Sequence, residues 1–180
     1  HELQGASRGE LGRASPAEHV RIFTENEKHS LLEWGPPVHT RRRGLISRAF
    51  LSRQIERLRP FLVNLANGLI DQFEKQDEGE LLTAYATPIP VQVICHLLGA
   101  PADMADQFLA WSHDHVGMYM AKRDRAAEDR AVKAVSEFST YMRGLIAERR
   151  RDLQGDLLSE LIRAEAEGQK LSEDELVTTA

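Results

Sequence analysis

Apolar side chains recur every three or four residues through most of this 180-residue chain, and this spacing is what most limits its fold. The period matches the 3.6-residue turn of an α-helix, whereas a half-buried β-strand needs strict alternation of apolar and polar residues. Phe61, Leu65, Leu69 and Phe73, for example, are each four residues apart. We find no convincing alternating segment and no internal repeat. The sequence therefore predicts an all-α fold.

The N-terminal part is expected to be less regular than the rest. Residues 1–18 are polar, contain three glycines and show no apolar period, which predicts a loop or a poorly ordered segment. Residues 19–34 predict an irregular stretch with one short helix. A helical body is expected over residues 36–180.

Proline, glycine and capping residues predict where helices of this body start and stop. Pro36 and Pro37 suit a first helical turn, because a proline lacks only an N–H that has no helical partner there. Pro60 is expected to separate a short helix from a longer one. Gly99 predicts a helix end. Other helix starts are expected at Thr87–Pro88, at Asp156, and at Ser172 with Glu175, which form a capping box.

The composition excludes some classes of function. A formal net charge of −5 does not fit a chain that binds nucleic acid over its whole surface. The single cysteine excludes an internal disulfide framework and fits a reducing compartment. No apolar run approaches the roughly 20 residues that span a bilayer. We therefore expect a cytoplasmic protein with neither a nucleic-acid partner nor a membrane partner.

Basic residues gather locally in the segment 39–60, which holds seven arginines and one acidic residue. His39 and Arg43 are four residues apart, so on a helix they would share a face. Both can donate hydrogen bonds to a carboxylate or a phosphate near the helix N-terminus. Two interpretations remain open from spacing alone: an anion site, or a solvated basic face. A second basic run, Arg149–Arg151, is most simply a helix end in solvent.

Two other groups of residues suggest metal chemistry but have simpler interpretations. Cys95 lies on the apolar face of VQVICHLLG, where a lone cysteine is usually a small buried hydrophobe. His113 and His115 are two residues apart, so on a helix their rings would point roughly 200° apart. They could not share one metal ion, and we expect no metal ligand in this chain.

Five segments resemble the cytochrome P450 family of bacteria. PPVHTRRRGLISRAF resembles a helix whose usual form is DPPEHTRLRRLVSRAF, and LRPFLVNLANGLIDQFE resembles the next helix. ATPIPVQVICHLLGAP resembles PLPVxVICELLGVP, and FLAWS matches FxxWS. GDLLSELIRAEAEGQKLSEDELVTTA resembles the segment that leads into the long central helix. The segments occur in family order over roughly residues 15–180.

This resemblance implies a role for several residues. His39 and Arg43 take the positions that bind the propionates of haem in the family, whereas Arg41 and Arg42 do not. Gly35 stands where aspartate is usual, and Arg42 where an apolar residue is usual. Candidate substrate contacts follow from the family's variable loop and from the helix over its substrate pocket; they are Leu31, Leu32, Trp34, Met118 and Tyr119.

The resemblance also implies that residues 1–180 form an incomplete domain of the mainly α P450 fold. The family's cysteine loop, oxygen-activating helix and ExxR helix have no counterpart here, and His1 in place of methionine predicts a trimmed, processed or incomplete chain. The complete protein would be a haem-thiolate monooxygenase that uses O2, a small organic substrate and electrons from a ferredoxin and its reductase. The isolated chain is expected to be inactive. An all-α ligand-binding or regulatory module without haem is the alternative interpretation.

Overall fold

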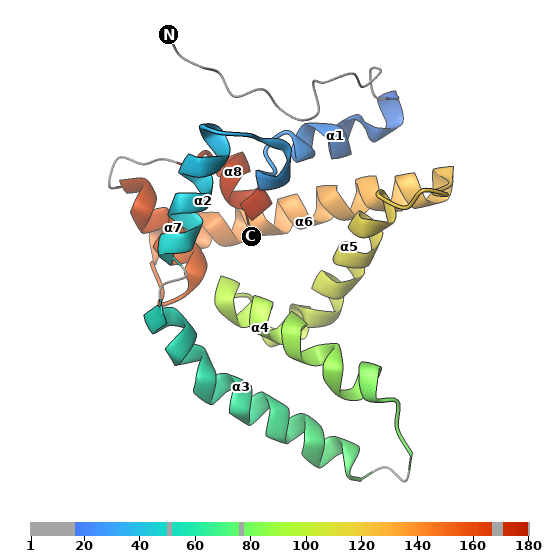
Figure 1. Cartoon of the computed structure of the whole chain (residues 1–180), viewed down its shortest axis with the longest axis vertical. Coiled ribbons are helices and arrows are strands. Elements are labelled where there is room, and N and C mark those ends of the chain that lie inside the picture. Colours follow the sequence, from blue (N-terminus) through green and yellow to red (C-terminus); the bar gives the residue numbers. More distant parts are fainter. Residues whose placement is uncertain (1–16, 50–51, 76–77, 167–170, 180) are drawn as a thin grey trace.

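The computed structural model describes residues 17–49, 52–75, 78–166 and 171–179. Its α-helices are α1 (Arg21–Glu27), α2 (Val38–Ala49), α3 (Ser52–Phe73), α4 (Pro88–Leu98), α5 (Ala105–Gly117), α6 (Arg125–Arg151), α7 (Leu157–Ala166) and α8 (Glu173–Thr179) (Figure 1). Shorter elements are the 3-10 helices η1 (Glu18–Val20), η2 (Leu31–Glu33) and η4 (Ala102–Met104) and the π-helix η3 (Leu82–Ala86). These ranges contain no β-strand, which confirms the all-α prediction.

The structure describes the N-terminal region, which the sequence predicts to be irregular, only from residue 17. Residues 1–16 of the expected loop lie outside the described residues, and Glu18 already begins η1. The segment 19–34 forms three short helical elements, η1, α1 and η2. It therefore holds more helix than the single short one that the sequence predicts.

Helix α6 is the long support on which α5, α1, α7 and α8 pack (Figure 1). An aromatic cluster joins α5 to α6, with Phe108 and Trp111 against Phe138 and Tyr141. The rings of Phe108 and Tyr141 meet edge to face, with centroids 5.6 Å apart and an interplanar angle of 90°. Such pairs add to the free energy of area burial. The cluster therefore fixes how α5 crosses α6.

The deepest part of the core is built from five helices. Its larger apolar side chains are less than 2% exposed and come from α2, α4, α6, α7 and α8: Leu45, Cys95, Met142, Ile146, Leu158, Leu161, Leu176 and Val177. Fully burying one such aliphatic side chain stabilises the fold by about 1.5–3 kcal/mol. Leu45 is thus the apolar anchor that holds the basic helix α2 to the rest of the molecule.

Helix α3 lies at the edge of the molecule and packs against η3 and α4 (Figure 1). Phe61, Leu65, Leu69 and Phe73 form an apolar stripe along one face of the helix, as their four-residue spacing predicts, but they are only half-buried. Phe61 stacks on His96 of α4, with ring centroids 4.1 Å apart. The stripe therefore contacts neighbours on one side without becoming part of the deep core.

The prediction that Pro60 separates two helices is wrong. Helix α3 runs without interruption from Ser52 to Phe73 and contains Pro60 inside it. A proline in a helix interior removes one hydrogen bond and costs about 3 kcal/mol. The other hydrogen bonds of this 22-residue helix and its packing on α4 offset that cost.

The predicted helix caps are confirmed by hydrogen bonds. Asp156 Oδ1 accepts from the backbone N–H of Ser159, at 2.7 Å, at the start of α7. Ser172 Oγ accepts from the N–H of Glu175 at 3.1 Å, and Glu175 Oε2 accepts from the N–H of Ser172 at 2.8 Å, which completes the capping box. Gly99 ends α4 in the left-handed conformation, with φ of 73°.

The prediction that the whole run Arg149–Arg151 is solvated is wrong for Arg149. Its side chain is buried, and Nε donates to Asp156 Oδ2 at 2.6 Å while Nη2 donates to the carbonyl of Gly99 at 2.7 Å. Arg150 and Arg151 are exposed. Arg149 is buried because its partners come from the ends of α4 and α7, which α6 brings together.

Replacing Gly99 by alanine is expected to destabilise the fold by about 1–2 kcal/mol, because a left-handed residue with a Cβ is strained. The added Cβ would also collide with the carboxylate of Asp156 and lie 2.6 Å from Arg149 Nη2. Gly144→Ala is the matched control, since a Cβ there meets nothing within 4 Å. Urea unfolding of both variants checks this, and equal midpoints for Gly99→Ala and wild type would contradict it.

Candidate functional site

The two residues predicted to bind an anion lie on one continuous helix. His39 and Arg43 belong to α2, one turn apart, with His39 half-buried and Arg43 exposed. Within the described ranges, neither side chain has an ion-pair or hydrogen-bond partner. Both are therefore available as donors to an external group.

The two arginines between them are engaged elsewhere. Arg41 Nη2 donates to Glu175 Oε1 at 3.0 Å, and Arg42 Nη2 forms an ion pair with the same oxygen. Arg42 is 6% exposed and Glu175 is 7% exposed, so this pair is buried between α2 and α8. The sequence indicated only that Arg42 was unusual, and Glu175 was predicted only as a helix cap.

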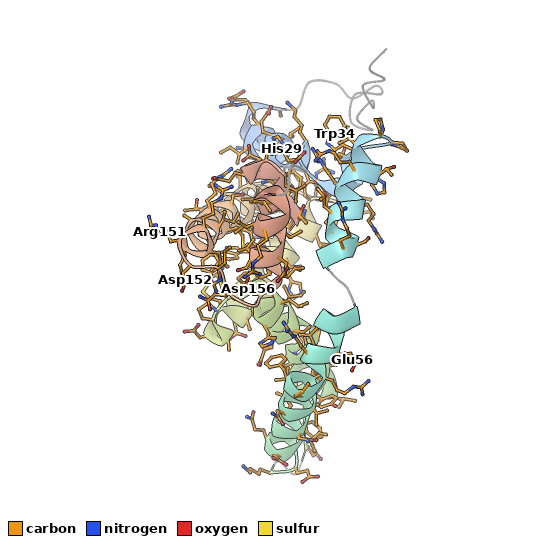
Figure 2. All side chains as sticks on the ribbon, turned by 90° about the vertical axis from the view of Figure 1, so that its left-hand side faces the viewer. His29, Trp34, Glu56, Arg151, Asp152 and Asp156 are labelled. Carbon is orange, nitrogen blue, oxygen red and sulfur yellow. The ribbon has the colours of Figure 1, made fainter. Side chains whose placement is uncertain are left out.

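Arg42 also contacts the segment that follows α1. Its Nη1 donates to the carbonyl of His29 at 2.9 Å, and Thr178 Oγ1 of α8 donates to the same carbonyl at 2.7 Å. The guanidinium lies 5.5 Å from the ring centroid of Trp34, within the range of a cation–π contact. Figure 2 shows His29 and Trp34 at the end of the molecule where α2 and α8 lie, away from Glu56 on α3.

The available donors of α2 fit a carboxylate-bearing group such as a haem propionate. Glu175 compensates charge at Arg41 and Arg42, whereas His39 and Arg43 have no acceptor of their own in the described part of the chain. A carboxylate that leaves water needs charge-assisted donors to offset its desolvation. His39 and Arg43 could supply such donors from two adjacent turns.

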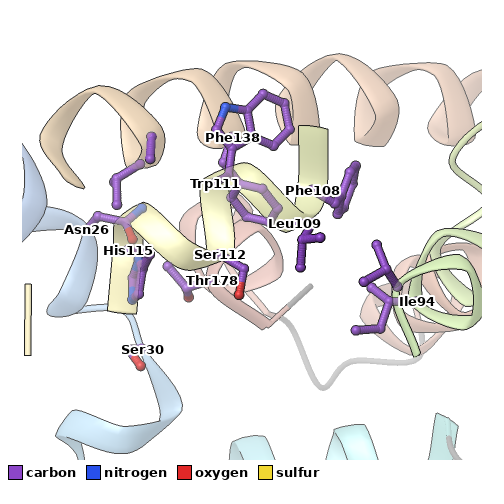
Figure 3. A pocket seen from close by; sticks show the side chains of 13 residues that line it. Asn26, Ser30, Ile94, Phe108, Leu109, Trp111, Ser112, His115, Phe138 and Thr178 are labelled. Atoms are coloured by element: carbon purple, nitrogen blue, oxygen red, sulfur yellow. The ribbon is translucent and has the colours of Figure 1, made fainter. Parts of the chain in front are cut away.

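A pocket of about 310 Å³ lies between α5, α6, α4 and the ends of α1 and α8 (Figure 3). One part is apolar and includes Ile94, Phe108 and Trp111; the other carries polar side chains. The polar side chains are those of Asn26, Ser30, Ser112, His115 and Thr178. The pocket could therefore hold a mainly apolar molecule with one polar end.

None of the five predicted substrate contacts is among the residues that line this pocket. Leu32 is 75% exposed, and Tyr119 is exposed and donates a hydrogen bond to Glu27. Met118 is buried in a small cluster with Phe23. The remaining two are half-buried: Leu31 in η2 and Trp34 beside it, whose Nε1 donates to the carbonyl of Lys28 at 2.6 Å. Their roles toward a substrate stay predictions.

Residues that suggested metal chemistry lie apart from one another. Cys95 is 1% exposed, and burial raises the pKa of its thiol, which disfavours the thiolate that binds metals. His113 is exposed, and His115 faces Glu27 at 3.6 Å. No group of three or more potential metal ligands occurs in the part of the chain that the structure describes.

Among the helices of the described residues, none combines the length and apolar character that crossing a bilayer requires.

Comparison with known proteins shows similarity to cytochromes P450. The chain is 34% identical over 177 residues to the mycinamicin IV hydroxylase/epoxidase of Micromonospora griseorubida, covering 98% of this chain and 43% of that protein. It is 37% identical over 140 residues to the polyketide biosynthesis cytochrome P450 PksS of Bacillus subtilis, covering 78% of this chain and 33% of that protein. No model of a protein family matches the chain.

The fold is similar as well. A crystal structure of P450BioI with a hexadec-9Z-enoic acid-ligated acyl carrier protein superposes with a TM-score of 0.85 and 25% identity, over 97% of this chain and 44% of that one. The arrangement of helices is thus that of one part of a mainly α haem-protein fold. The chain belongs to the cytochrome P450 family, and it spans 33–43% of the length of these two curated relatives.

Proposed function

We propose that this chain forms part of a haem-thiolate monooxygenase, in which His39 and Arg43 of α2 bind the haem propionates. The observation that carries the proposal is their pairing one turn apart on α2, without partners in the described structure, beside two arginines that Glu175 already engages. Haem supplies the activation of O2 when bound. The residues of this chain hold its carboxylates and orient it.

The chain is also proposed to shape part of the substrate site. The pocket between α4, α5 and α6 is mainly apolar with a polar end, and such a lining suits a small organic molecule. The substrate contacts that the family resemblance implies lie outside this pocket and are proposed as a further part of the site; they are Leu31, Leu32, Trp34, Met118 and Tyr119. The substrate receives one oxygen atom from O2, and the electrons come from a separate donor of the ferredoxin and ferredoxin reductase type. The protein is proposed to act in the cytoplasm.

The double substitution His39→Ala/Arg43→Ala in the full-length protein tests the propionate contacts. A hydrogen bond to a charged group contributes about 1.5–3 kcal/mol. Because Arg43 is exposed, we expect a loss in the lower half of that range, so haem should dissociate about ten- to fortyfold faster. The measurement is haem transfer to an excess of apomyoglobin, followed by visible absorbance.

Arg57→Ala is the matched control for this experiment. Arg57 belongs to the same basic segment but is an exposed residue of α3, and it is expected to leave the transfer rate unchanged. An unchanged rate in the double variant would overturn the propionate assignment. If Arg57→Ala speeds haem transfer equally, the effect comes from the loss of positive charge in the basic segment and not from contacts with the propionates.

A further inference from the structure

Burial of the charged Arg42 side chain is expected to cost free energy. Arg42 takes a position where the family's motif has an apolar residue, and its side chain is nevertheless buried. Burying an unpaired charge costs several kcal/mol, so such a residue needs close partners. Nη1 and Nη2 have them, while Nε is buried with no hydrogen-bond partner among the described residues.

The partners of Arg42 come from three other segments. Glu175 belongs to α8, His29 to the turn after α1, and Trp34 follows η2. Glu175 is itself held in place, because its Oε2 accepts from Ser172 in the capping box and leaves Oε1 to the arginines. Arg42 thus connects α2 to a carboxylate that has a fixed position.

Helical geometry links this contact to the candidate propionate donors. Successive residues of an α-helix are rotated by about 100°, so Arg42 and Leu45 lie about 60° apart on the inner face of α2. Leu45 is 1% exposed in the core. With these two side chains inward, His39 and Arg43 both fall on the adjoining side of the helix. Rotation of α2 would move both donors together.

We propose that Arg42, through its buried pair with Glu175, is a positioning residue that fixes the rotation of α2 and so aims His39 and Arg43 at the haem propionates. This inference rests on the proposed function. Leu45 and the half-buried Ile46 hold the helix against the core, but apolar packing is less directional than a charge-assisted hydrogen bond. The charged contacts to Glu175 and His29 supply that direction.

The test compares Arg42→Met and Glu175→Gln in the haem-bound full-length protein. We expect each to speed haem transfer to apomyoglobin about tenfold, as expected when a charge-assisted contact is lost. The resonance-Raman bands of propionate bending should shift as they do in His39→Ala/Arg43→Ala. Arg42→Lys, which keeps the charge, should recover part of both effects.

Arg149→Met is the control, because it breaks another buried arginine–carboxylate pair that does not involve α2. It should lower stability and leave the propionate bands and the rate of haem transfer unchanged. If Arg42→Met folds and leaves both the propionate bands and the rate of haem transfer unchanged, the inference is overturned. If Arg42→Met does not fold, the same two measurements on Glu175→Gln decide. If His39→Ala/Arg43→Ala changes both readouts and the other variants change neither, only the positioning role fails. If that double variant also changes nothing, the propionate assignment fails as well.

Discussion

The isolated 180-residue chain, reduced and exposed to carbon monoxide, is expected to show no long-wavelength absorbance band of thiolate-ligated haem. The full-length protein should show that band. Such a band requires a cysteine thiolate on iron. The single cysteine of the chain, Cys95, is buried in the core with the pKa of its thiol raised by burial, so it is not available as that ligand.

The absorbance band is expected to be absent from the isolated chain and present in the full-length protein, and the same is expected of catalytic turnover. The isolated chain should oxidise no substrate with an electron donor of the ferredoxin type, while the full-length protein should. A Cys95→Ser variant of the full-length protein is the control, and it should keep the band. A thiolate band in the isolated chain, or its loss in Cys95→Ser, would contradict the account.

The substitution Arg149→Met is expected to reduce the free energy of unfolding by about 3–5 kcal/mol, the cost of breaking a buried ion pair on one side. It would leave the carboxylate of Asp156 without its arginine, at a side-chain exposure of only 7%. The carbonyl of Gly99 would also lose its donor. Urea or thermal unfolding measures the loss.

Arg151→Met is the matched control for Arg149→Met. Arg151 lies in the same basic run but is exposed at the surface (Figure 2), and a change there should alter stability by less than about 0.5 kcal/mol. Equal losses for the two substitutions would mean that the buried contacts of Arg149 contribute nothing beyond those of a surface arginine.

Helix type and helix ends could be predicted from local sequence. The cap at Asp156, the capping box of Ser172 and Glu175, and the left-handed end at Gly99 all appear as expected. Each depends on contacts within a few residues, which a sequence displays directly. Pro60 was mispredicted because tertiary packing and the rest of a long helix outweigh one local preference.

Which arginines are buried, and which acidic residues they pair with, could not be predicted from local sequence. Arg42, Arg149 and Arg151 all belong to short basic runs, and only contacts between distant segments decide which are buried. Arg41, for example, pairs with Glu175, 134 residues further along the chain. The pocket lining has the same origin: α1, α4, α5, α6 and α8 each contribute residues to it.

The candidate site was predictable only where its residues share one helix. His39 and Arg43 have a fixed spacing on α2 whatever the rest of the chain does, so spacing and resemblance were enough to propose them as a pair of donors. Glu175 carried a local signal for its capping role and none for its role opposite Arg42. A contact between residues as distant in sequence as Arg42 and Glu175 can be identified only once the fold is known.

A crystal structure of the haem-bound full-length protein would test the central claim most directly. The quantity to measure is the distance from the propionate oxygens to the ring nitrogens of His39 and the guanidinium nitrogens of Arg43. We predict charge-assisted hydrogen bonds of about 2.7–2.9 Å from both side chains. Propionates held by other residues, with His39 and Arg43 facing solvent, would contradict the account.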